Sequence, residues 1–268
     1  MRIGNREFEL GKHTYVMGIL NVTPDSFSDG GKYNERKAAK VQIQKMIEEG
    51  ADIIDVGGES TRPGHEQISE EEEIKRIVPV IQMIKSEFDV PVSVDTYKSE
   101  VAEAALLAGA DMLNDIWGFL YDERMAELAA KHDVPVCLMH NRNNTDYTDF
   151  VEDVLKDMEQ CIAVAQKHGV KRDKIILDPG IGFGKTYEQN LLMMKHLERF
   201  CQMGYPVLLG TSRKSMIGLT LDLPATERVE GTLATSVVGA IKGCDFVRVH
   251  DIKENVRALR MTEAILHV

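Results

Sequence analysis

KIILDPGIGFGKTYEQ, residues 174–189, joins a short aliphatic run to a glycine-rich turn and then to a helical pattern. Three glycines alternate with Ile181 and Phe183, and glycine permits positive φ angles and a close approach of backbone N–H groups to a ligand. A carboxylate, Asp178, stands before the turn and Lys185 stands after it. The stretch therefore predicts a strand that ends in a ligand-binding loop and continues as a helix.

Two phosphate-binding motifs come close to fitting this loop. A Walker A motif needs glycine where this chain has Pro179, and a GxGxxG motif that starts at Gly180 would end on Lys185. From the loop alone, an interpretation in which the glycines only turn the chain at a helix start stays open. The loop has no nucleotide signature, and we interpret Lys185 as a structural or supporting lysine.

A pattern of aliphatic run, polar end and amphipathic stretch recurs along the whole chain. The aliphatic runs cover residues 15–20, 52–56, 91–95, 112–115, 135–140, 174–178, 206–211 and 246–250. The helical patterns cover residues 35–49, a stretch that starts near Ser69, and residues 98–108, 122–132, 149–168, 187–203, 226–242 and 251–266. Near-continuous apolar strands that alternate with helices are typical of parallel strands buried on both faces.

These strand–helix units predict an α/β fold, a closed (β/α)8 TIM barrel, with residues 1–268 as a single domain. A turn signal at Gly4-Asn5 predicts a short N-terminal hairpin within residues 2–13. Glycine just past a helical pattern predicts a left-handed helix stop. Such stops are expected at Gly109, Gly169, Gly204 and Gly243.

Charge and cysteine content narrow the class of protein. Of the 268 residues 43% are hydrophobic, and 32 basic against 43 acidic residues give a net charge of −11. An acidic surface repels nucleic acid and anionic membranes, so we expect neither as a partner. Four scattered cysteines fit a reducing compartment, and no apolar run reaches the roughly 18 residues of a membrane helix. Without an apolar signal core near the N-terminus, these features predict a cytoplasmic protein.

Polar residues end the predicted strands at one mouth of the barrel, where this architecture carries its chemistry. Asp95, Asn114 and Asp178 offer carboxylates and an amide. Such groups suit a flat heterocycle with several N–H donors and one carbonyl, such as a guanine-like or pterin ring. Lys214 adds a donor for a ring oxygen or nitrogen.

A second group of strand-end residues suits an anion. Arg62 follows the second strand, Arg248 and His250 end the eighth, and Asn21 ends the first, which neighbours the eighth in a closed barrel. Two cations, a histidine and an amide on one side of the mouth suit a phosphate or pyrophosphate. Taken alone, His250 favours a structural or capping role. Its neighbour Arg248, on the same face of the strand, favours anion binding.

Four other strand-end residues have simpler interpretations. Met139 and Phe183 could sandwich the ring, although methionine at such a position also serves as core filling. Asp115 and Asp251 are interpreted as N-caps of the helices that follow them.

Seven motifs in this order resemble the dihydropteroate synthases, a family of pterin-binding barrels. They are NVTPDSFSDGG (21–31), GGESTRPG (57–64), SVDT (93–96), LND (113–115), DPGIGFGKT (178–186), GTSRKS (210–215) and RVHD (248–251). The resemblance runs from about residue 14 to residue 266. It implies condensation of 6-hydroxymethyl-7,8-dihydropterin diphosphate with 4-aminobenzoate to 7,8-dihydropteroate and pyrophosphate, a step of folate biosynthesis.

The resemblance also implies roles for individual residues. Pterin contacts are Asp95, Asn114, Ile116, Met139, Asp178, Phe183, Gly210 and Lys214. Diphosphate contacts are Asn21, Thr61, Arg62, Arg248 and His250, with Mg²⁺ held near Asn21. Aminobenzoate contacts are Phe27, Thr61, Arg62, Pro63, Phe183, Lys214 and Ser215. The residues expected to be catalytic are Asp95, Lys214, Arg248 and His250, and the family further implies a homodimer formed through the late helices.

The implied chemistry gives Asp95 a distinct task. Pyrophosphate leaves well only when its charge is neutralised, which Mg²⁺ together with Arg248 and His250 would do. The carbon it leaves is attached to an electron-rich pterin, so a cation-like intermediate is expected, and Asp95 would stabilise that charge. The first two loops, with Phe27 on the first, would close to exclude water.

Two other readings of the sequence stay open. A pterin-dependent methyltransferase of the corrinoid type also uses a barrel with an Asp/Asn pterin site, but it would not need Arg62, Arg248 and His250. A catalytically silent barrel that acts as an assembly partner should lack the full set of polar strand ends, which this chain keeps.

Overall fold

The protein was analysed as a computed structural model that describes residues 1–22, 32–59 and 67–268. Within these residues, eight parallel strands form one sheet in the order β8-β7-β6-β5-β4-β3-β10-β9. The strands are β3 (Tyr15–Asn21), β4 (Ile53–Gly57), β5 (Val92–Asp95), β6 (Met112–Asp115), β7 (Val136–Met139), β8 (Ile175–Asp178), β9 (Leu208–Leu209) and β10 (Phe246–Val249). A parallel bridge between Leu177 and Val207 joins the two ends of the sheet, which confirms the predicted TIM barrel.

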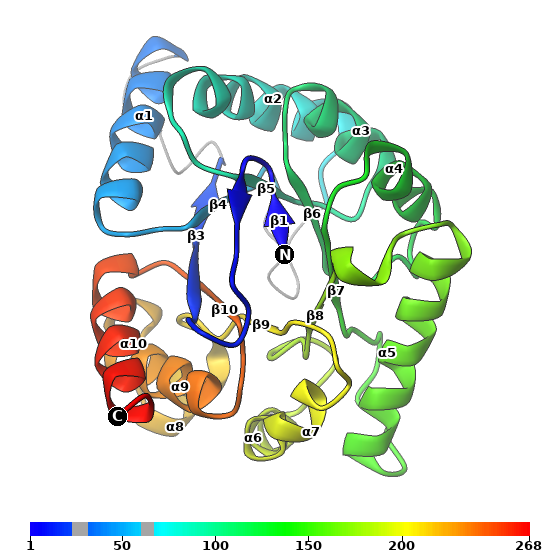
Figure 1. Ribbon diagram of the computed structural model, residues 1–268, viewed down its shortest axis with the longest axis vertical. Helices are drawn as coiled ribbons and strands as arrows, with labels where there is room; N and C mark the ends of the chain where they lie inside the picture. The colour runs from blue at the N-terminus through cyan, green and yellow to red at the C-terminus, as the bar shows by residue number, and fades with distance from the viewer. Residues whose placement is uncertain (23–31, 60–66) are drawn as a thin grey trace.

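Helices surround the strands on the outside, as Figure 1 shows. They are α1 (Lys32–Glu48), α2 (Glu70–Glu87), α3 (Ser99–Leu107), α4 (Arg124–His132), α5 (Phe150–Lys167), α6 (Tyr187–Lys195), α7 (Leu197–Cys201), α8 (Ser215–Leu221), α9 (Val229–Ile241) and α10 (Ile252–Leu266). No helix in the described ranges is both long and apolar enough to cross a lipid bilayer.

Side-chain caps and glycine stops define several of the helix ends. Ser69 accepts the backbone N–H of Glu72 at 3.2 Å and so caps α2. Thr186 and Gln189 form a reciprocal capping box at the start of α6. The four expected glycine stops, Gly109, Gly169, Gly204 and Gly243, have φ angles of 107°, 93°, 76° and 95°.

Two predicted helices differ from the structure, and one short helix was not predicted. The helix expected over 187–203 is two helices, α6 and α7, which meet at His196 with φ −105° and ψ 20°. The short helix α8 was not predicted, because its seven residues are fewer than a periodic hydrophobic pattern needs. The helix expected from residue 226 begins at Val229, after a single 3₁₀ turn that follows Pro224.

Neither of the two expected aspartate N-caps has the predicted contact. Asp115 accepts the backbone N–H groups of Trp117 at 2.7 Å and Phe119 at 3.0 Å, so it stabilises the turn after β6 and not the start of the next helix. Asp251 occupies the N-cap position of α10 without a capping bond. Its carboxylate instead accepts the Arg213 Nε–H at 2.9 Å, because a nearby cation binds it more strongly than a neutral backbone N–H.

A short antiparallel hairpin, β1 (Arg2–Ile3) and β2 (Arg6–Glu7), closes one end of the barrel. Its turn needs Gly4, which has φ +58°. Ile3 and Phe8 of this segment pack with inward residues of the strands in one buried cluster. The strand residues of that cluster are Met17, Ile53, Met112, Cys137, Ile176, Leu208 and Phe246.

Side-chain alternation along the strands then places polar groups at the opposite end of the barrel. Because every second residue faces inward, Asp55 lies one pleat above Ile53. Asn114, Asp178 and Arg248 stand in the same relation to Met112, Ile176 and Phe246. The barrel interior is therefore apolar at the hairpin end and charged at the other.

Candidate active site

Arg248 lies between two buried carboxylates at the charged end of the barrel. Its Nε donates to Asp55 Oδ2 at 2.6 Å, and its Nη2 donates to Asp95 Oδ2 at 2.6 Å. Asp55 is 0% exposed and Asp95 is 4% exposed. The second oxygens, Asp55 Oδ1 and Asp95 Oδ1, are buried and have no hydrogen-bond partner among the described residues. A ligand that donates N–H groups would satisfy them, since an unpartnered buried polar group costs about 1–3 kcal/mol.

This arrangement sets the charge of the centre. Burial, with a smaller effect of the neighbouring Asp55, raises the pKa of Asp95 to about 7 against the opposing effect of Arg248. Burial disfavours the charged form of Arg248, but the two carboxylates outweigh it and raise the pKa of the guanidinium. Two acids thus share one permanent cation, and Asp95 titrates near neutrality.

Asn114 and Asp178 line the same interior. Asn114 is paired in register with Asp95, and its Nδ2 donates to Asp55 Oδ2 at 3.2 Å. Asp178 is 4% exposed and accepts the Gly180 N–H at 2.7 Å. Burial raises the pKa of Asp178, whereas Lys214 and the Gly180 N–H favour its ionised form.

Gly210 leaves space in the middle of these groups. A Cβ atom at this position would lie 3.5 Å from Asp178 Oδ2, 3.7 Å from Lys214 Nζ and 4.0 Å from Arg248 Cβ. Residues from β8, β10 and the β9–α8 loop therefore surround a position without a side chain. A flat ring could lie against this backbone with a carboxylate and an ammonium group at its edge.

Lys214 is fixed by the glycine-rich loop. Its Nζ donates to the Ile181 carbonyl at 2.5 Å and lies 4.7 Å from the centre of the Phe183 ring. Burial lowers the pKa of Lys214 to about 8, with Arg248 adding to the shift and Asp178 opposing it. At neutral pH the group is mainly an ammonium donor.

An apolar wall completes this side of the pocket. Tyr97, Ile116 and Met139 form a buried cluster, and Trp117 and Phe183 pack against it. The structure thus brings together the apolar residues that the sequence assigned to a pterin ring. Their contact with a pterin stays a prediction.

The residues assigned to the diphosphate are held differently. His250 Nδ1 lies 2.9 Å from Ser212 Oγ, and the His250 backbone N–H donates to the same oxygen at 3.1 Å. Asn21 and Asp95 flank Gly57, since a Cβ there would lie 3.8 Å from Asn21 Oδ1 and 3.7 Å from Asp95 Oδ2. Arg248 is turned into the barrel toward its two carboxylates, so a diphosphate would compete with them for the guanidinium.

Several predicted site residues fall outside the described part of the chain. They are Phe27, Thr61, Arg62 and Pro63. Ser215 is the first residue of α8 and is exposed next to Lys214.

The sequence did not lead us to predict two residues of the site. Asp55 lies inside an aliphatic run instead of at its end, and only its inward alternation with Ile53 could have revealed it. Ser212 belongs to the GTSRKS motif, but its bonds to His250 could not be inferred without the fold.

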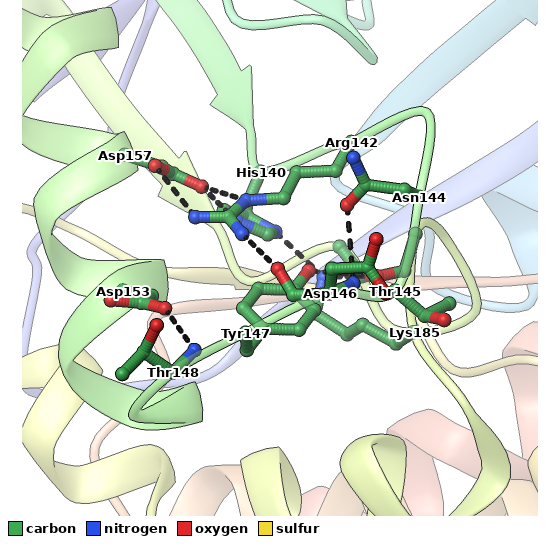
Figure 2. Close-up of polar contacts among 12 residues, drawn as sticks. His140, Arg142, Asn144, Thr145, Asp146, Tyr147, Thr148, Asp153, Asp157 and Lys185 are labelled. Atoms are coloured by element: carbon green, nitrogen blue, oxygen red, sulfur yellow. Dashed lines mark hydrogen bonds and ion pairs between the residues drawn. The ribbon is translucent and has the colours of Figure 1, made fainter.

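A polar network supports the glycine-rich loop from the neighbouring β7–α5 segment (Figure 2). Lys185 Nζ contacts His140 Nδ1 at 2.7 Å, and His140 Nε2 contacts Asp157 Oδ2 at 3.0 Å. Arg142 donates to both Asp157 oxygens, from Nε at 2.6 Å and from Nη2 at 3.1 Å. Burial lowers the pKa of Lys185 to about 7, with Lys214 adding to the shift and Asp178 opposing it.

His140 gives this network a measurable signature in acid. Burial lowers the pKa of His140 from 6.5 to about 4, and Lys185 adds to the shift while Asp157 opposes it. Between these values the unfolded chain binds a proton that the folded chain does not, so the contribution of the neutral His140 to stability is complete above pH 6.5 and is lost as pH falls toward 4. Buried carboxyl groups with a raised pKa, such as Asp95, act in the opposite direction over the same range, so the effect is measured against a variant without the imidazole. We expect the contribution of His140 to be about 3 kcal/mol in the free energy of unfolding, measured by urea titration.

The control for this measurement is His140→Gln, which has no titrating group at this position and should lack this contribution between pH 6.5 and 4. Asp157 acts in a separate window: burial opposes its ionisation, but hydrogen bonds from His140 and Arg142 outweigh this and lower its pKa to about 2. Its contribution is therefore lost only below pH 3.8. Equal profiles for both proteins would show that His140 does not carry the effect.

Known proteins are similar to this chain over nearly its whole length. The family model of pterin-binding enzymes matches residues 17–250. The chain is 63% identical to the dihydropteroate synthase of Clostridium beijerinckii over 267 residues, which cover 99% of each protein.

Two solved structures are similar as well. One is a dihydropteroate synthase from Clostridium difficile in the presence of pteroic acid, with a TM-score of 0.94, 52% identity and coverage of 97% of this chain and 99% of that one. The other is Xanthomonas albilineans dihydropteroate synthase with 4-aminobenzoic acid, with a TM-score of 0.91, 41% identity and coverage of 96% and 94%. The chain therefore belongs to the dihydropteroate synthase family of pterin-binding enzymes.

Proposed function

We propose that this chain condenses 6-hydroxymethyl-7,8-dihydropterin diphosphate with 4-aminobenzoate to give 7,8-dihydropteroate and pyrophosphate. The observation that carries the proposal is the set of buried Asp95, Asn114 and Asp178 with the half-buried Lys214, in which Asp178 and Lys214 lie next to the bare backbone of Gly210. Solved relatives with pteroic acid and with 4-aminobenzoic acid support the same substrates.

Each polar group has a task toward the pterin. Asp178 accepts two adjacent N–H groups of the aminopyrimidinone edge, and Asn114 donates and accepts beside it. Lys214, with a pKa of about 8, donates an N–H to a ring oxygen or nitrogen. Ile116, Met139 and Phe183 cover the ring faces and keep water out of the pocket.

The diphosphate leaves at the side of the mouth formed by β3 and β10. Arg248 and His250 bind its oxygens, and Ser212 holds the imidazole of His250 in place. Mg²⁺ usually takes few protein oxygens together with substrate phosphates, and the Asn21 amide oxygen at the end of β3 fits that pattern. The described residues contain no group of three or more acidic, His or Cys side chains able to hold a metal, so the ion is proposed to arrive with the diphosphate. When bound, it neutralises phosphate charge and so makes pyrophosphate a better leaving group.

Asp95 acts on the carbon that reacts. As the carbon–oxygen bond breaks, its electron pair goes to the departing diphosphate and positive charge develops on the pterin. The ionised Asp95 stabilises that charge from a buried position, where an electrostatic contact is strong. The aminobenzoate nitrogen then bonds to the carbon and loses one proton, which needs no strong base.

The aminobenzoate site is proposed to lie outside the pterin, nearer the mouth. Phe183 and Lys214 face both substrates, and Ser215 lies next in the chain at the start of α8. Phe27, Thr61, Arg62 and Pro63 are proposed to complete this site.

Release of pyrophosphate from the pterin diphosphate tests the function. With Mg²⁺ and 4-aminobenzoate present, the protein should release one pyrophosphate per dihydropteroate formed. Omission of 4-aminobenzoate, or addition of EDTA, should abolish the steady-state release. Pterin-dependent methyl transfer that requires cobalamin, with no release of pyrophosphate, would instead identify the corrinoid-type methyltransferase, and no turnover of either kind would identify a silent barrel.

The same proposal includes a homodimer and a cytoplasmic enzyme. Leu219, Leu221, Val238 and Ile241 on the contacting helices α8 and α9 are 66%, 46%, 37% and 59% exposed. Large apolar side chains on neighbouring helices are typical of a subunit interface. Sedimentation of a monomer at micromolar concentration would contradict the dimer. All four cysteines are free thiols, in keeping with a reducing compartment.

A further inference from the structure

Two lysines hold the glycine-rich loop through its backbone carbonyls. Lys185 Nζ donates to the carbonyls of Gly180 and Phe183, each at 3.0 Å. Lys214 Nζ donates to the carbonyl between them in sequence, that of Ile181, at 2.5 Å. The position of the Lys214 ammonium group therefore depends on a peptide unit whose neighbours are fixed by Lys185.

The third contact of Lys185 fixes its own orientation. Because Asp157 is an acceptor, the ring hydrogen of His140 is on Nε2, and Nδ1 presents a lone pair to the lysine. The lowered pKa of His140 agrees with this neutral tautomer. An ammonium group has three N–H donors, and here it meets three acceptors, namely two carbonyls and one imidazole nitrogen.

The loop also lies directly on the backbone of the β7–α5 segment. A Cβ on Gly180 would come within 1.9 Å of the His140 carbonyl oxygen, and one on Gly184 within 2.7 Å of the Arg142 carbonyl oxygen. The Tyr147 hydroxyl donates to the Gly184 carbonyl at 2.7 Å. The loop therefore has a rigid support on one side and the ligand pocket on the other.

We propose that Lys185, oriented by His140 and Asp157, is a positioning residue that fixes Phe183 and, through the Ile181 carbonyl, Lys214 against the second substrate. The inference rests on the proposed function, since the substrates named are those of the synthase. The three N–H donors of the Lys185 ammonium group are directed at His140 Nδ1 and at the carbonyls of Gly180 and Phe183. Its influence on the reaction passes through the loop.

The geometry predicts that loss of Lys185 weakens the interaction with 4-aminobenzoate more than the interaction with the pterin diphosphate. Asp95, Asn114 and Asp178 lie at the ends of their own strands, so the sheet mainly sets the positions of these three groups, although Asp178 also accepts the Gly180 N–H of the loop. Phe183 belongs to the loop, and Lys214 is bonded to it, so the aminobenzoate side should suffer most.

The test uses the full chain with Lys185→Met, which keeps the length of the side chain and removes all three donors. Lys171→Met serves as the matched control, since Lys171 is a surface lysine paired with Asp133. We expect KM for 4-aminobenzoate to rise about tenfold and kcat to fall severalfold, while KM for the pterin diphosphate changes by less than about threefold. The control should match the parent in all three constants.

A second measurement separates positioning from loss of fold. Trp117 is the only tryptophan of the chain and packs in the cluster with Phe183, so its emission reports binding of 6-hydroxymethylpterin. Binding by Lys185→Met should stay within about threefold of the parent. In addition, the effects of Lys185→Met and His140→Gln on KM for 4-aminobenzoate should be non-additive, because the two residues act as one unit.

Two outcomes would overturn the inference: an unchanged KM for 4-aminobenzoate in Lys185→Met, or equal losses for both substrates together with weakened pterin binding, which would indicate a merely structural lysine. Failure of the proposed function is recognised separately, because the parent protein would then release no pyrophosphate in response to 4-aminobenzoate.

Discussion

Asp95→Asn should lower kcat by about 10²- to 10³-fold, the scale expected when one preorganised electrostatic contact to a charged transition state is removed. The substitution keeps the shape of the side chain and removes only its charge. Arg248 keeps its bond to Asp55, so the centre does not lose all of its counter-charge. The affinity for the pterin diphosphate should change far less than kcat, because Asn114 and Asp178 still bind the ring edge.

The pH profile gives this prediction a second readout. In the free enzyme the pKa of Asp95 is about 7, raised by burial and by Asp55 against the effect of Arg248. The carboxyl becomes protonated as pH falls through 7, so kcat/KM of the parent should fall tenfold per unit below that pH. Asp95→Asn should lack this limb.

The matched control is Asp149→Asn, at the N-cap of α5, where asparagine caps as well as aspartate. It should have the kcat of the parent. An unchanged turnover in Asp95→Asn would refute the proposed stabilisation of a cation.

Lys98→Met should lower the free energy of unfolding by about 3–5 kcal/mol, the cost of removing one partner from a buried ion pair. Lys98 Nζ donates to Glu59 Oε2 at 2.6 Å, to Glu73 Oε2 at 2.8 Å and to the Ile68 carbonyl at 2.8 Å. The side chains of Glu59 and Glu73 are only 3% and 2% exposed. Burial disfavours the charge on Lys98, but its bonds to the two glutamates outweigh this and raise its pKa, so the lysine is charged in the folded state.

Urea titration at pH 7 measures the loss. Methionine fills the volume of lysine but removes the ammonium group that joins the two buried carboxylates. Addition of Glu73→Gln should restore part of the stability, because one of the two charges is then removed. Lys167→Met, at an exposed ion pair with Glu123, should cost less than about 1 kcal/mol. A loss that small for Lys98→Met would show that the cluster does not stabilise the fold.

Much of the barrel follows from the sequence, because its signals are local. Aliphatic runs bounded by polar residues, the Ser69 cap and the glycine stops each act within a few residues. The prediction is less accurate for β9. The aliphatic run over 206–211 predicts a strand of six residues, but only Leu208–Leu209 form regular strand. Its pairing with β8 consists of one bridge, which depends on barrel closure and not on local sequence.

The site was less predictable wherever a side chain has a choice of partners. Asp251 looked like a helix cap and instead binds Arg213, because a cation from a distant loop is brought within reach only by the fold. Arg248 was assigned to an anion site, but its bonds to Asp55 and Asp95 join strands distant in sequence and could not be inferred. Charge and position along a strand predicted that these residues share one mouth. Charge and position could not predict which carboxylate each cation would contact.

The change from apolar to charged side chains along the barrel interior also constrains how the strands assemble. If β4 slipped by two residues along its neighbours, Asp55 would enter the layer of Met17, Ile53 and Met112 beside the hairpin. An unpaired carboxylate in such surroundings is strongly disfavoured, and it would lose Arg248 as its partner. A shift by one residue would turn it toward the helices instead. The charged groups at this end of the barrel thus also favour the correct alignment of the strands during folding. Catalysis and correct assembly therefore depend on the same few residues.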